Sequence, residues 1–216
     1  MIVFSLMLTI CMLASCKTVP DHLKLPNYSS NMTLGTYKNL EYSLLQNYDD
    51  EEMQKNAVFD AVMIEIMENS TYTSYPENRI ARLVGIANDT VTVYAQNNNM
   101  TPEEFLKQSY GFESVDAYNQ YVRYQAQSYF QVRMTIFEIA RQEHMTVTQE
   151  EFDAARAELL AESELPEAEF EQNYDNEDIL FRAVYPKVRD FLYNNSTNIT
   201  KIVATTQPSE STTEST

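Results

Sequence analysis

Glycine is scarce in this chain: Gly35, Gly85 and Gly111 are the only three among 216 residues. A P-loop or a dinucleotide-binding fingerprint needs two or three glycines within a few positions. The nearest two here, Gly85 and Gly111, are 26 positions apart. A β-barrel with tight turns also uses more glycine than this. The sequence therefore excludes the usual phosphate-binding loops and disfavours a small barrel.

Positive charge is scarce as well, with 15 Lys and Arg against 32 Asp and Glu, so the net charge is −17. Nucleic-acid backbones are bound through clustered Lys and Arg side chains, and polybasic segments hold anionic lipid. The composition therefore indicates no nucleic-acid partner and disfavours a polybasic attachment to membranes. The 44% hydrophobic content is sufficient for the core of one acidic, mostly helical domain with appendages.

Only two histidines and two cysteines occur, which leaves little for metal binding or nucleophilic catalysis. A zinc site takes three or four such ligands at suitable spacing, and the sequence has neither HExxH nor CxxC. It also lacks the G-x-S-x-G motif of a serine nucleophile. His144 follows a long predicted helix, where a cation suits the negative end of the dipole. We therefore expect no metal, no cofactor and no catalytic residue.

The first fifteen residues, MIVFSLMLTICMLAS, carry no charge and precede Cys16. The run is shorter than the ~20 residues of a membrane-spanning helix, and its length is typical of a secretory signal. Leu13-Ala14-Ser15-Cys16 resembles the lipobox of bacterial lipoproteins, in which the cysteine is diacylated and becomes the first mature residue. The resemblance implies lipidation at Cys16 and a lipid-anchored protein on the extracytoplasmic face of a bacterial cell membrane. The alternative is a buried N-terminal helix with two ordinary cysteines.

The composition divides the chain into five segments. Residues 1–15 are the expected lipoprotein signal peptide, and residues 16–32, polar and with two prolines, a flexible tether. Residues 33–48 include β-favouring side chains and predict one short strand with a linker. Residues 49–194 carry the patterns of a helical domain. Residues 195–216 are rich in Ser and Thr and predict a disordered tail.

Apolar side chains recur at helical spacing throughout residues 49–194. Sequence signals for a helix N-terminus occur at 49–52, Pro76, Thr101, Ser114, Thr148 and Asp175. Those at Thr101 and Thr148 are capping boxes, with Glu three positions later. The longest helix is expected from about 115 to 143. Five or six helices and a single strand make the predicted class all-α.

An acidic run covers residues 150–178, where twelve carboxylates stand against one cation, Arg156. A calcium loop needs a regular pattern of acids around a glycine, and this stretch has no glycine. Paired acids for glycosidase chemistry remain open, although nothing distinguishes two of the twelve. We interpret the run as a solvated, self-repelling helical face.

Aromatic residues gather between 110 and 130: Tyr110, Phe112, Tyr118, Tyr121, Tyr124, Tyr129 and Phe130. At about 100° per residue, the core-facing stripe of the long helix is expected to include Val115, Tyr118, Val122, Ala126 and Tyr129. Tyr121 and Tyr124 fall away from it, and exposed tyrosines adapt to varied apolar partners. Tyr110, Phe112, Tyr121 and Tyr124 are therefore the candidate binding surface, with second-layer packing as the alternative.

Four motifs, in this order and spacing, resemble one family. They are Leu34 to Tyr42 (LGTYKNLEY), Ile66 to Glu77 (IMENSTYTSYPE), Met100 to Leu106 (MTPEEFL) and Ala140 to Glu151 (ARQEHMTVTQEE). Together they resemble the C-terminal, SurA-like chaperone domain of trigger factor, in the variant found in exported lipoproteins of Gram-positive anaerobes. The resemblance covers about residues 33–194 and implies an elongated multi-helix peptide-binding domain.

The resemblance implies a membrane-anchored holdase for unfolded or nascent exported polypeptides. The family's ribosome-docking domain has no counterpart in this sequence. Between Tyr42 and Met53 there is also no room for its FKBP-type isomerase domain of roughly a hundred residues, so we expect no prolyl isomerase activity. Two alternatives stay open at this stage: a residual or partner-dependent prolyl isomerase, and a scaffold lipoprotein with one defined partner.

Overall fold

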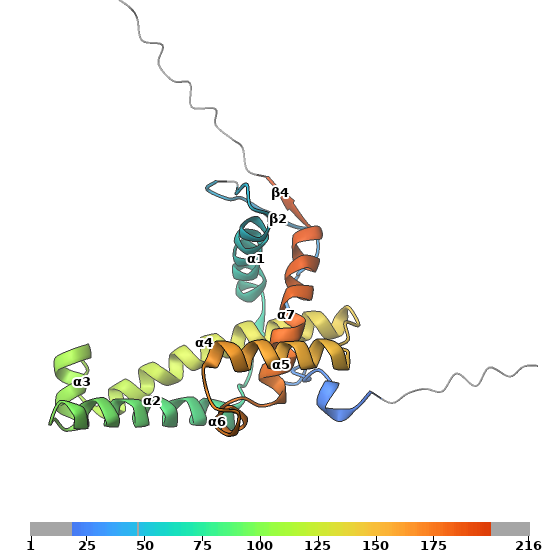
Figure 1. Ribbon diagram of the computed structural model, residues 1–216. Helices are drawn as coiled ribbons and strands as arrows, with labels where there is room; N and C mark the ends of the chain where they lie inside the picture. The colour runs from blue at the N-terminus through green and yellow to red at the C-terminus, as the bar shows by residue number, and fades with distance from the viewer. Residues whose placement is uncertain (1–18, 47, 200–216) are drawn as a thin grey trace, which may run out of the picture.

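The computed structural model describes residues 19–46 and 48–199, and within them the fold is almost entirely helical (Figure 1). In chain order the elements are η1 (Asp21–Leu23), β1 (Met32–Thr33), β2 (Leu40–Tyr42), α1 (Glu51–Glu68), β3 (Thr71–Tyr72), α2 (Glu77–Asn97), α3 (Pro102–Tyr110), α4 (Val115–Gln142), α5 (Gln149–Ser163), α6 (Glu167–Asn173), α7 (Asn176–Asn194) and β4 (Ser196–Asn198). The predicted all-α class is confirmed.

Side-chain caps explain where most of the helices begin. Thr101, Thr148 and Asp175 each form a capping box, in which the cap side chain and the third helical residue bond each other's backbone N–H groups. Asp50 and Ser114 cap α1 and α4 in the simpler way, by accepting one backbone N–H. The predicted starts are therefore confirmed to within a residue or two. Helix α6 was not predicted. Its seven residues contain a single buried apolar side chain, Phe170, so the sequence shows no helical repeat of apolar residues there.

The overall shape is that of a long arm joined to an upright pair of helices (Figure 1). Helix α4 has 28 residues and is about 42 Å long at 1.5 Å per residue. Helix α2 packs along its N-terminal part, and α3 covers the end of this arm. Helices α1 and α7 pack together over the other half of the molecule, with α5 against α7. We call α2, α3 and the N-terminal half of α4 the arm.

Two separate hydrophobic cores support this shape. The larger core joins α1, the C-terminal half of α4, α5 and α7, and includes fully buried Ile66, Phe137 and Val188. The smaller core lies at the arm tip and consists of Val91, Ala95, Phe105 and Leu106. Because the tip has its own core, the arm keeps its shape at a distance from the body.

The N-terminal segment differs from the expected flexible tether of residues 16–32. From residue 19 onward it packs on the body, with Leu23, Tyr28 and Met32 each less than 9% exposed. The Tyr28 backbone N–H donates to Glu138 of α4 at 2.6 Å, and β1 pairs antiparallel with β3. The tether prediction is therefore wrong for residues 19–32. A few apolar side chains spaced irregularly along an extended segment leave no period to recognise.

The expected single strand within residues 33–48 exists as β2, but it is one of four short strands among the described residues. Its partner is β4, aligned in parallel with Leu40 opposite Ser196 and Tyr42 opposite Asn198. Residues 195–199, assigned to a disordered tail, therefore belong to the fold, and the remainder of that tail lies outside the described residues. A two- or three-residue strand depends on a distant partner, which composition does not reveal.

Replacing two of the glycines with alanine should change the free energy of unfolding in opposite directions. A Cβ on Gly35 would lie 2.7 Å from the carbonyl carbon and oxygen of Asn69, whereas one on Gly85 would meet nothing within 4 Å. Gly35→Ala should lower the free energy of unfolding by about 1–3 kcal/mol through overpacking. Gly85→Ala, in the middle of α2, should raise it by about 0.5–1 kcal/mol through helix propensity. Urea unfolding of both variants measures this, and a neutral Gly35→Ala would contradict the close packing.

Candidate functional site

A groove runs between the arm and the start of α7, formed by three adjoining cavities. The central cavity, of 400 Å³, lies between α2, α4, α6 and α7. It shares Tyr129, Tyr174 and Asp178 with a cavity of 340 Å³ beside α5 and α7. It shares Ile86 and Asn173 with a cavity of 470 Å³ along α2. We call these three cavities together the groove.

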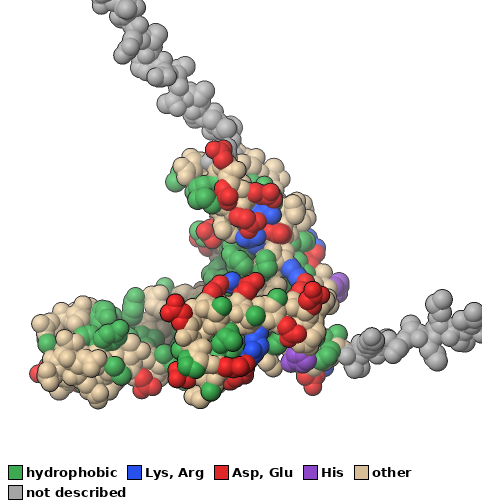
Figure 2. Space-filling model, in the orientation of Figure 1, with side chains coloured by type: hydrophobic (Ala, Val, Ile, Leu, Met, Phe, Trp, Pro, Cys, Tyr) green, Lys and Arg blue, Asp and Glu red, His purple; other side chains and the backbone are tan. Residues whose placement is uncertain are grey.

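The walls of the groove are mostly apolar and partly open to solvent. Ile86, Val93 and Tyr94 of α2 are 44%, 55% and 53% exposed, and Tyr129 of α4 is 46% exposed. Figure 2 shows hydrophobic side chains along the arm, while acidic side chains are more frequent over α5 and the upright helices. Apolar surface of this kind, left open in a folded chain, indicates a binding function.

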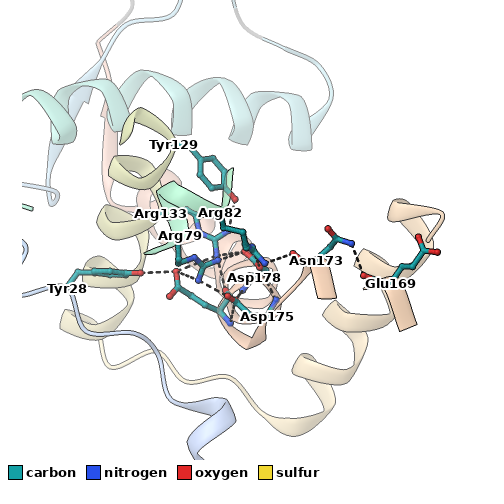
Figure 3. Close-up of polar contacts among 10 residues, drawn as sticks. Tyr28, Arg79, Arg82, Tyr129, Arg133, Glu169, Asn173, Asp175 and Asp178 are labelled. Carbon is teal, nitrogen blue, oxygen red and sulfur yellow. Dashed lines mark hydrogen bonds and ion pairs between the residues drawn. The ribbon is translucent and has the colours of Figure 1, made fainter. Parts of the chain in front are cut away.

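Three arginines and three carboxylates form an ionic cluster at the base of the arm (Figure 3). Arg79 of α2 contacts Asp178 at 2.7 Å and Glu177 at 2.8 Å. Arg133 of α4, only 2% exposed, contacts Asp178 at 3.1 Å. The cluster also includes Arg82 and Asp175. Its six charges balance, and it joins α2, α4 and α7 at the groove.

Burial and neighbouring charges shift the pKa of two groups at this cluster, Asp175 and Tyr28. Burial alone would raise the pKa of Asp175, but the Arg79 guanidinium and hydrogen bonds with Asp178 outweigh it and lower that pKa. Burial, and then the charge of Glu177, raise the pKa of Tyr28 far above its usual range. The Tyr28 hydroxyl therefore stays protonated and donates to Glu177 at 2.8 Å. The cluster serves to hold helices together.

The sequence interpretation of the acidic run needs a correction at its end. Asp175, Glu177 and Asp178 belong to the ionic cluster and do not form a freely solvated face. Their partners Arg79 and Arg133 lie on other helices, many positions away in the chain, so no local pattern predicts the pairing. Within the described residues, no three His, Cys, Asp or Glu side chains are grouped to hold a metal ion.

The four residues predicted as a binding surface lie on the arm, outside the cavities of the groove. Tyr110, Tyr121 and Tyr124 are 60%, 50% and 65% exposed, while Phe112 is partly buried, with its ring centroid 5.3 Å from that of Tyr121. Tyr110 lies edge-on to Phe105, with ring centroids 5.8 Å apart. Tyr124 follows Tyr121 by about one helical turn. The assignment of these four to binding stays a prediction.

An aromatic path connects the tip with the groove. Tyr94 lines the 470 Å³ cavity along α2 and stacks on Phe105, with ring centroids 6.1 Å apart. Phe105 in turn contacts Tyr110. Tyr129 was expected to face the core, but at 46% exposure it lines the groove instead. Sequence reasoning missed the groove because its walls come from five separate helices. The available signal was an excess of aromatic residues over those that the helical stripe requires.

A family model for the C-terminus of the bacterial trigger factor protein matches residues 38–191. The chain belongs to this family. No curated protein sequence and no solved structure matches the chain. Membership of the trigger factor C-terminal family indicates a chaperone-like role, which involves binding unfolded polypeptides.

The predicted lipidation site, Cys16, lies outside the described residues, as does the whole of the expected signal peptide. Among the residues that are described, no helix combines the length and the apolar character needed to cross a bilayer.

Proposed function

We propose that this trigger factor C-terminal domain is a lipid-anchored, extracytoplasmic holdase that binds unfolded exported polypeptides along the groove. The observation that carries the proposal is the open groove itself, with half-exposed Ile86, Val93, Tyr94 and Tyr129 along walls contributed by several helices. An unfolded chain exposes apolar side chains at irregular intervals. A long groove with separate apolar positions can bind such chains without requiring one sequence.

The shape of the arm supports this proposal. Helices α2 and α4 extend well beyond the main core and keep their geometry through the small core at the tip. A client segment that leaves the groove at Tyr94 meets the aromatic path through Phe105 to Tyr110. Tyrosine offers apolar contact together with a polar end, which suits contact with variable sequences. The groove is therefore the main binding surface and the tip its extension.

The Leu13-Ala14-Ser15-Cys16 motif supports the anchoring part of the proposal. A diacylglycerol on Cys16, with a further acyl chain on its amino group, is sufficient for stable attachment, because each buried CH₂ contributes about 0.8 kcal/mol. Anchoring would place the groove where unfolded chains emerge from export.

The test is client binding by groove variants. Ile86→Ser/Val93→Ser removes two exposed side chains from the groove wall, so folding should be little affected. Losing about 1 kcal/mol or more per side chain predicts roughly 30-fold weaker client binding. The measurement is the concentration of protein that suppresses aggregation of an unrelated unfolding protein, together with the Kd for an unfolded, labelled client.

Met53→Ser/Ile64→Ser is the matched control, since these α1 side chains are 55% and 62% exposed and lie outside the groove. It should bind clients as the unmodified chain does. Tyr121→Ser/Tyr124→Ser at the tip should give a smaller loss than the groove variant, with unchanged melting. Equal losses for the control and the groove variant would contradict the proposal, as would no loss for either.

A further inference from the structure

A second cavity lies at the end of the body where the described chain starts, away from the arm tip. It has a volume of 680 Å³, larger than any of the three cavities of the groove. One wall is the N-terminal segment with Val19 and Leu25, and the other is the turn after α4 with Met145 and Thr146. We call it the basal cavity. The purple histidine side chains in Figure 2 lie at this end of the molecule.

The lining of the basal cavity combines apolar side chains with basic ones. Lys24, Arg141 and His144 line it, and no carboxylate does. This is unexpected in a chain with twice as many acids as Lys and Arg, and each cavity of the groove includes an aspartate. Such a lining suits a molecule with an anionic group next to an apolar part.

Lys24 and Arg141 are each paired with one carboxylate and remain partly exposed to solvent. Lys24 is paired with Asp21 at 2.6 Å, and its side chain is 59% exposed. Arg141 is paired with buried Glu138 at 3.0 Å, and about a third of its side chain remains exposed. The Lys24–Asp21 pair is exposed on both sides and is therefore weak, so Lys24 can exchange Asp21 for another anion. Arg141 keeps its buried partner Glu138, and only the exposed third of its side chain remains for a ligand.

The basal cavity lies close in the chain to Cys16, which indicates that an anionic ligand with an apolar part would come from the membrane. Val19, which lines the cavity, follows Cys16 by three residues, and three residues span at most about 11 Å. A lipid on Cys16 would therefore hold the cavity close to the head groups of the membrane. The net charge of −17 repels an anionic surface within about one Debye length, ~8 Å at physiological salt. A face on which Lys24 and Arg141 offset the neighbouring carboxylates is therefore the one that can approach it.

We propose that the basal cavity takes the head group of an anionic phospholipid from the membrane to which the chain is anchored. The phosphate lies near Lys24 and Arg141, and the glycerol region lies against Val19, Leu25 and Met145. The inference rests on the lipid anchor of the proposed function. Binding of the head group would orient the molecule, because the arm and its tip lie at the opposite end from the basal cavity and would project away from the membrane (Figure 1).

The absence of tryptophan makes a direct test possible. Thr146 is exposed and lines the cavity, so Thr146→Trp places the only tryptophan of the chain at the cavity. The chain from Cys16 onward keeps every described residue and has one thiol, which is coupled to a maleimide lipid in vesicles containing phosphatidylglycerol and brominated lipid. Bromine should quench this tryptophan at least twofold more strongly than one placed on the arm by Tyr124→Trp.

A charge reversal with a matched control tests the phosphate contact. Lys24→Glu should reduce the quenching of the Thr146→Trp chain by half or more, and replacing phosphatidylglycerol with phosphatidylcholine should have a similar effect. Lys107→Glu is the control, because Lys107 is 64% exposed and paired with one acid at 2.6 Å, much as Lys24 is. It should leave the quenching unchanged.

Equal quenching of the tryptophans at positions 146 and 124 would overturn the inference, as would equal effects of Lys24→Glu and Lys107→Glu. A tryptophan at position 146 that is shielded from solvent only at high protein concentration would also overturn it, because the occupant of the cavity would then be a second copy of the chain. The lipid is attached chemically in this experiment, so the result does not depend on lipidation in cells or on client binding. Failure of the inference is therefore distinguishable from failure of the proposed function.

Discussion

Arg133→Ala should lower the free energy of unfolding by about 3–5 kcal/mol, because it leaves a buried cluster with an excess of negative charge. The Arg133 guanidinium contacts Asp178 at 3.1 Å and donates to the Tyr129 hydroxyl at 2.6 Å and to the Glu177 carbonyl at 3.0 Å. It also lies 4.4 Å from the ring centroid of Phe181. All four contacts are lost together. Urea unfolding at neutral pH measures the change.

Arg123→Ala is the matched control on the same helix. Arg123 is 46% exposed and makes one ion pair, to Glu77 at 2.7 Å. Exposed pairs of this kind contribute about 0–1 kcal/mol, so unfolding should be nearly unchanged. If Arg133→Ala cost no more than Arg123→Ala, the ionic cluster would not be what holds the base of the arm together. The groove would then depend on apolar packing alone.

Cys16→Ala should move the protein from the membrane to the soluble fraction or to a retained precursor in a bacterial host. The expected effect is close to all-or-none, since the proposed attachment depends on the thioether that only the Cys16 thiol can form. Loss of the acyl chains removes many buried CH₂ groups at about 0.8 kcal/mol each. Membrane fractionation and the intact mass of the protein measure it.

Cys11→Ala provides the control, because Cys11 is the only other cysteine and lies within the expected signal peptide. Its replacement should leave both the membrane fraction and the mature mass unchanged. An unchanged mass and unchanged fractionation for Cys16→Ala would contradict lipidation at that residue. The groove and its client binding would remain to be judged by their own experiment.

All the described helices except α6, and their beginnings, could be predicted from the sequence, because each depends on interactions within a few residues. The capping box at Thr148 and the cap at Ser114 are local hydrogen bonds, and the apolar period of a long helix is visible in one window. The order of the motifs was sufficient to indicate the trigger factor family, which the match over residues 38–191 confirms. The exposure of Tyr121 and Tyr124 also followed from helical geometry alone.

Only the tertiary structure decided how these helices come together, because each deciding contact joins residues far apart in the chain. The pairing of β2 with β4 closes residues 40–42 on 196–198, and Tyr28 bonds Glu138 and Glu177. The groove exists because Ile86 of α2, Tyr129 of α4 and Tyr174 of the connection between α6 and α7 meet in one place. Local composition determines which segments become helices, whereas the faces that remain open depend on which distant segments cover the others.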